Sequence, residues 1–64
     1  MTRIRRAGYV FITRKADHAP WHVHVYRGDD LIVKWDLEED EPITGMASTK
    51  LIELIHDLRR EGLL

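Results

Sequence analysis

The sequence predicts an α+β domain in which a small antiparallel sheet of three or four strands packs on one C-terminal helix. Short runs rich in β-branched and aromatic residues come first, and one stretch with helical periodicity follows near the C-terminus. A Gly-Asp turn joins the two runs that alternate most strictly between apolar and polar residues, which is typical of a hairpin. The 64 residues match the length of one domain, so residues 1–64 are expected to fold as a single unit.

The predicted strands follow in chain order. Residues 9–13 form the first, and residues 15–20 are typical of a loop, because Pro20 biases the residue before it away from helix. Residues 21–26 alternate in the second strand: Trp21, Val23 and Val25 share one face, and His22, His24 and Tyr26 share the other. Residues 31–37 alternate in the same way, with one face formed by Leu31, Val33, Trp35 and Leu37.

The remaining elements complete the sheet and supply the helix. Residues 42–45 form either a short edge strand or a turn. Ser48 or Thr49 caps a helix that is predicted to run to about Gly62. The apolar face of this helix comprises Leu51, Leu54, Ile55 and Leu58. The sheet contributes Trp21, Val23, Val25, Val33 and Trp35 to the core. The opposite sheet face is expected to be open to solvent or to a partner, and it carries His22, His24, Tyr26, Lys34 and Asp36.

Composition narrows the functional classes. The chain has no cysteine, which excludes a disulfide framework and a thiolate metal site and favours a reducing compartment. No apolar stretch approaches the roughly 18 residues of a membrane span, so we expect a cytoplasmic protein with neither a signal peptide nor an anchor. A chain this short buries only about 60% of its unfolded surface. A metal or a second copy in a homo-oligomer is therefore a candidate source of extra stability.

The net charge of −1 conceals a division along the chain. Residues 1–28 carry a balance of +5 and residues 29–64 a balance of −6. The basic side chains of the first part are a candidate phosphate-binding patch, with Tyr9 and Tyr26 available for base stacking: Arg3, Arg5, Arg6, Arg14, Lys15 and Arg27. The alternative is that these charges pair within the fold. A pI near 6.4 also lies below the basic value typical of a dedicated nucleic-acid binder.

The most informative stretch is the histidine segment, residues 17–25. His22 and His24, two residues apart on a strand, lie about 6–7 Å apart on the same face. One neutral and one protonated imidazole at this spacing suit acid–base catalysis, which needs no cofactor. A zinc site is a second interpretation, with His18 or Asp17 as a third ligand. A third is that the histidines are polar sheet residues, hydrogen-bonded to neighbours or to an interface.

The same segment resembles a small bacterial family of unknown function whose hallmark strand begins His-Pro-Pro-Pro-His-Val-His-Val. The matching residues are His18, Pro20, His22, Val23, His24 and Val25, while Ala19 and Trp21 replace the outer two prolines. Gly8-Tyr9-Val10-Phe11, the hairpin with Trp35 and the helix entry Gly45-Met46-Ala47-Ser48 also correspond to the family. Family members usually continue through a longer helix and tail, whereas this sequence ends at Leu64.

The resemblance implies the toxin side of a predicted toxin–antitoxin pair, with an antitoxin-like protein as partner. On this hypothesis His22, His24 and His18 form the working site. Arg14, Tyr26 and Lys34 bind the target. If the chain is catalytic, RNA cleavage without a required metal is the expected reaction. The alternative is a non-enzymatic protein-binding module, a small inhibitor or regulator, that uses the same sheet face or its edge.

Overall fold

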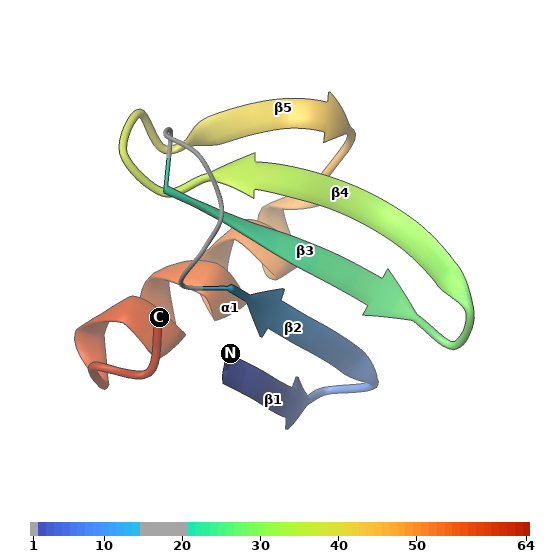
Figure 1. The fold of residues 1–64 in the computed structure, drawn as a ribbon, viewed down its shortest axis with the longest axis horizontal. Coiled ribbons are helices and arrows are strands. Elements are labelled where there is room, and N and C mark those ends of the chain that lie inside the picture. Colours follow the sequence, from blue (N-terminus) through green and yellow to red (C-terminus); the bar gives the residue numbers. More distant parts are fainter. Residues whose placement is uncertain (1, 15–20) are drawn as a thin grey trace.

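The computed structural model describes residues 2–14 and 21–64. One sheet and one helix make up the fold, in the order β1 (Thr2–Arg6), β2 (Tyr9–Thr13), β3 (His22–Arg27), β4 (Asp30–Asp36), β5 (Glu41–Gly45) and α1 (Thr49–Arg60). Every strand pairs antiparallel with its neighbours in the chain, and Figure 1 shows the sheet running from β1 to β5 with α1 lying against it. The predicted α+β class with one C-terminal helix is confirmed. The predicted strand number is wrong, because the sheet has five strands rather than three or four.

The strand that the sequence did not predict is β1. Three of its five residues are arginine, so it lacks the run of β-branched and aromatic residues that identifies a strand. It pairs along its whole length with β2 through a turn at Ala7 and Gly8, whose φ angles are 53° and 82°. Positive φ at both central residues defines the hairpin turn that matches the twist of the strands. Alanine is uncommon at such a position, which weakens the sequence signal.

The edge strand β5 settles the alternative that residues 42–45 left open, because they pair with β4. The β3–β4 ladder is irregular: Tyr26 lies opposite Leu31, and Val25 lies opposite Val33. The extra residue moves Leu31 off the predicted core face, and its side chain is 46% exposed. The prediction that Leu31 belongs to the core face is therefore wrong.

The core lies between one face of the sheet and α1. Its buried apolar side chains are Phe11, Val23, Val25, Val33, Trp35, Leu37, Leu51, Ile55 and Leu58. Trp21, predicted to join them, lies just before β3 and is 40% exposed, so that prediction is wrong. Its backbone carbonyl instead accepts a hydrogen bond of 2.8 Å from the N–H of Leu37.

The ends of α1 follow the predicted signals. Ser48 is the N-cap, and its hydroxyl accepts a hydrogen bond from the N–H of Leu51. At the other end Gly62, with φ of 78°, lies just beyond the C-cap and reverses the chain. No helix in the described part of the chain is both long and apolar enough to cross a membrane.

Polar contacts attach α1 to the sheet at three places. The Arg6 guanidinium donates two hydrogen bonds to the Glu61 carboxylate, at 2.5 and 2.9 Å. The His56 ring contacts both Asp40 carboxylate oxygens at 2.9 Å. Arg59 donates to the backbone carbonyl of Leu37, at the end of β4. The helix is thus linked to the edge strand β1 and to the β4–β5 turn.

Candidate functional site

The candidate site is built on the face of β3 that points away from α1. Val23 and Val25 are fully buried in the core, so the alternation of the strand turns His22 and His24 to the opposite face. Their ring centroids are 5.1 Å apart and the rings meet edge to face, at 70°. The predicted closeness of the two imidazoles is therefore present in the fold.

The end of this face near His22 is more enclosed than expected. His22 is 8% exposed, and Asp36, its neighbour across the β3–β4 pair, is 6% exposed. The Asp36 carboxylate accepts hydrogen bonds of 2.8 and 2.9 Å from the backbone N–H groups of Glu38 and Glu39. Asp36 therefore builds the turn after β4. The expectation that these two side chains lie open to solvent is wrong, and His24 is the more accessible imidazole.

Pairing between strands arranges the remaining candidates in rows across the sheet. One row runs Arg3, Ile12, His24, Lys34, and a second runs Arg5, Val10, Tyr26, Leu31. Residues in such a row share a face, so Lys34 of β4 lies beside His24, and Tyr26 lies on the histidine strand itself, two residues from His24. Arg14 is exposed and follows the last residue of β2. His18 lies outside the described residues, so its predicted place in the site is not tested.

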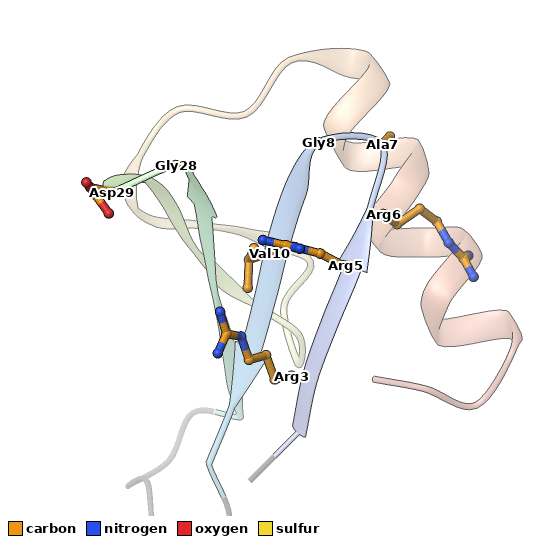
Figure 2. A pocket seen from close by; sticks show the side chains of 8 residues that line it. All are labelled: Arg3, Arg5, Arg6, Ala7, Gly8, Val10, Gly28 and Asp29. Atoms are coloured by element: carbon orange, nitrogen blue, oxygen red, sulfur yellow. The ribbon is translucent and has the colours of Figure 1, made fainter.

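The basic patch expected from the sequence is divided between two faces. Arg3 and Arg5 occupy the face of His24, and Figure 2 shows both side chains extending from β1 across β2. Arg6 points to the other face, where it pairs with Glu61. Arg27 lies over the ring of Tyr9, with 5.2 Å between its guanidinium carbon and the ring centroid. Neither Arg6 nor Arg27 therefore belongs to the histidine face. Lys15 lies outside the described residues.

Sequence reasoning missed that Arg3 lies in the same row of the sheet as His24, and Arg5 in the same row as Tyr26, with β2 between them. Their two-residue spacing would have placed both on one face, had residues 2–6 been recognised as a strand. The zinc site stays a prediction. The described residues contain no group of three or more histidine, aspartate or glutamate side chains that could hold a metal ion, but Asp17 and His18 are not among them.

Fold and site together define a small α+β domain with a basic, histidine-bearing sheet face. Comparison of the chain with protein-family models, with curated proteins and with solved structures gave no match.

Proposed function

We propose that the chain is a toxin-like component of a bacterial toxin–antitoxin pair, located in the cytoplasm, that acts on RNA through the outer face of β3. The observation that carries this proposal is the juxtaposition of two imidazoles, 5.1 Å apart, with arginine and lysine side chains in the same row of the sheet. Imidazoles transfer protons near neutral pH, and cations attract phosphate and stabilise the charge that develops on it. The histidine segment also resembles the family of unknown function whose members are predicted toxin–antitoxin components, which supports the same proposal.

The chemistry that suits this face is cleavage of RNA by its own 2′-hydroxyl. The His22–His24 pair takes the proton of the 2′-hydroxyl, and O2′ forms a bond to phosphorus. The bond from phosphorus to O5′ breaks, and the pair returns a proton to O5′. The products are a 2′,3′-cyclic phosphate and a 5′-hydroxyl, and no metal or other cofactor takes part. Since His22 is mostly buried, His24 is the imidazole placed to contact the RNA, and Lys34 beside it stabilises the phosphate charge.

The test is bacterial growth after induction of the wild type and of the His22→Ala/His24→Ala variant, at matched soluble expression. Because the buried His22 also contributes to packing, His24→Gln is a milder second variant. His56→Gln is the matched control, since it removes an imidazole from the helix and not from the site. We expect arrest by wild type and by the control, with fragments ending in cyclic phosphate, and growth with both site variants. Arrest that persists in the site variants, or normal growth with wild type, would overturn the proposal.

A second candidate function is a protein-binding module, and the exposed edge of the sheet favours it. All five residues of β5 are exposed, and exposed apolar side chains lie on or near this edge, including Ile43 and Met46. An unpaired edge strand is able to accept an extended segment of a partner, such as an antitoxin-like protein. Tight 1:1 complex formation that survives His22→Ala, with cellular RNA intact, would favour this function over RNA cleavage.

A further inference from the structure

A hollow of about 600 Å³ lies on the sheet face away from α1, beside the β1–β2 turn and the β3–β4 turn. Arg3, Arg5 and Val10 line its floor, and Gly28 and Asp29 lie at its far side. Figure 2 shows the two arginine side chains reaching in the same direction over β2, one on each side of Val10. Arg6 also belongs to the lining, but its guanidinium turns away to Glu61. The cations beside Val10 are therefore Arg3 and Arg5, and Figure 2 shows the Asp29 carboxylate turned away from both.

Arg3 and Arg5 differ from Arg6, Arg59 and Arg60 in the partners of their side chains. Arg6 and Arg60 are paired with carboxylates, and Arg59 donates to a backbone carbonyl. Within the described residues, by contrast, the side chains of Arg3 and Arg5 form neither an ion pair nor a hydrogen bond. Two adjacent guanidinium groups that repel each other and have no internal acceptor are suited to an anion from outside, because one phosphate accepts hydrogen bonds from both.

The register relates this anion position to the proposed site. Val10, between the two arginines, lies directly opposite Tyr26 of β3, and Ile12 lies opposite His24. Adjacent strands are about 4.8 Å apart, so a phosphate held over β2 lies one strand spacing from Tyr26. His24 is two residues from Tyr26 on the same face, about 7 Å along the strand. A phosphate at this position would therefore have the Tyr26 ring beside it on β3, and the His24 imidazole two residues away on the same face of that strand.

We propose that Arg3 and Arg5 together hold one phosphate of single-stranded RNA, with the adjoining base against Tyr26 and the neighbouring phosphodiester at His24. This inference rests on the proposed function and specifies its substrate. A single strand fits because its bases are free to stack on a tyrosine ring, whereas the bases of a duplex are stacked on each other. The face offers one phosphate position beside one aromatic ring, which suits the single sugar-phosphate backbone of one RNA strand rather than the two backbones of a duplex.

The test measures binding rather than cleavage. The probe is a fluorescein-labelled single strand of ten 2′-O-methyluridines, which cannot be cut because its 2′-oxygens carry no proton. Anisotropy titrations at several salt concentrations compare the wild type with Arg3→Gln/Arg5→Gln. The matched control is Lys50→Gln/Arg60→Gln, which removes two positive charges from the helix. Circular dichroism verifies that both variants keep the fold.

We expect Arg3→Gln/Arg5→Gln to weaken binding about tenfold or more, because a charge-assisted contact to phosphate is lost. The slope of log K against log salt should become shallower by about 0.7, the value for one phosphate of a single strand. The affinity of the control variant should stay within about twofold of the wild-type affinity, because the control loses only long-range electrostatic attraction to the RNA. A 2′-O-methyl duplex and poly-glutamate should compete poorly.

The inference is overturned if wild type does not bind the probe, or if the affinity is unchanged in Arg3→Gln/Arg5→Gln. It is also overturned if the control variant weakens binding equally, or if the duplex or poly-glutamate competes effectively. The growth assay separates this result from the proposed function. Arginine-dependent RNA binding without growth arrest leaves the phosphate position standing and removes the toxin hypothesis. Growth arrest that is equally strong in wild type and in Arg3→Gln/Arg5→Gln leaves the toxin hypothesis standing and removes the phosphate position.

Discussion

At the scale of single residues, one glycine determines how β5 joins the sheet. Gly45 ends β5 with φ of 82°, a conformation that side chains other than glycine rarely adopt. A Cβ atom at this position would lie 2.3 Å from the carbonyl oxygen of Ile32 and 3.1 Å from the Cα of Val33. The close approach is to backbone atoms, which have no rotamer by which to move aside. The glycine is therefore needed both for its φ angle and for the space it leaves.

We accordingly expect Gly45→Ala to destabilise the domain by more than about 1–2 kcal/mol, the usual cost of a left-handed alanine, because the clash adds to it. Urea unfolding followed by tryptophan fluorescence gives the free energy of unfolding. Gly8→Ala is the matched control, since Gly8 has the same φ but open space around its Cα. Equal losses in the two variants would show that the backbone contact at Gly45 is unimportant.

A second residue-scale feature is Asp40, which joins three parts of the molecule. The turn residue accepts contacts from His56 of α1 and a hydrogen bond of 3.1 Å from the indole N–H of Trp35 in β4. The hydrogen bond with His56 is the main cause that lowers the pKa of Asp40, and partial burial opposes it. A carboxyl whose pKa is depressed on folding stabilises the fold above its ordinary value of 3.8, and this contribution is lost as pH falls through the folded value.

The corresponding prediction is a pH-dependent effect of Asp40→Asn, a change that tolerates the positive φ of 58° at this position. At pH 6 we expect a loss of up to about 1 kcal/mol, small because nearly half of the side chain is exposed. The difference from wild type should shrink as pH falls below about 4 and Asp40 becomes protonated. Unfolding free energies measured at several pH values check this. A difference that grows in acid would contradict the assigned role.

At the scale of elements, α1 depends on the sheet because it is short. Twelve residues form only a marginal helix in isolation, so packing of its apolar face supplies most of its stability. Leu51, Ile55 and Leu58 are almost fully buried and fall on one face. The polar attachments at Glu61, His56 and Arg59 are exposed or partly exposed, and exposed ion pairs contribute little. The apolar contacts therefore hold the helix, and the polar contacts fix its position.

This ranking predicts that Ile55→Ala costs about 2–5 kcal/mol, the range for truncating a fully buried aliphatic side chain. Arg6→Gln, which removes the pair with Glu61, should cost much less. Thermal unfolding monitored by far-ultraviolet circular dichroism compares them. Because a domain of this size has a total stability of only about 3–10 kcal/mol, Ile55→Ala is expected to be partly unfolded at 37 °C. A larger effect from Arg6→Gln would reverse the ranking.

At the scale of the whole molecule, the sequence predicts the fold well where alternation and capping signals are strong. The strands that carry Phe11, Val23 and Val33, the Ser48 cap and the apolar helix face all appear as expected. The missed strand consists mainly of arginine, and the misplaced Leu31 results from a bulge, which shifts faces without a composition signal. Local propensity cannot show either effect, because both arise from pairing with a neighbouring strand.

The candidate site was predictable only in part, for a related reason. The two-residue spacing of His22 and His24 fixes their common face from sequence alone. The burial of His22, and the addition of Arg3 and Arg5 to the same face, depend on contacts between segments that are distant in the chain. Register is set by turns and by the apolar pattern of the complete sheet, so it becomes visible only when all five strands are assembled.

A whole-molecule prediction follows from the marginal size of the domain. A ligand that binds only the folded chain raises the stability by about 2.7 kcal/mol when present at about a hundred times its dissociation constant. For a domain of this length that corresponds to a rise in Tm of roughly 20 °C. We expect the single-stranded 2′-O-methyluridine probe to produce this shift with wild type. With Arg3→Gln/Arg5→Gln the shift should be about half as large or smaller, because the affinity falls at least about tenfold. A shift of the same size in both would mean that the RNA binds elsewhere.

The position of β1 at the border of the sheet has one more consequence. Among the described residues no strand pairs with its outer side, which a strand from another copy is therefore able to join. Charged side chains along such a border discourage that joining. Arg3 and Arg5 therefore contribute to colloidal stability as well as to the proposed phosphate contact. When both are neutralised, self-association should set in at lower protein concentration. Light scattering across a dilution series identifies the range in which the arginine variants are monodisperse and their affinities comparable.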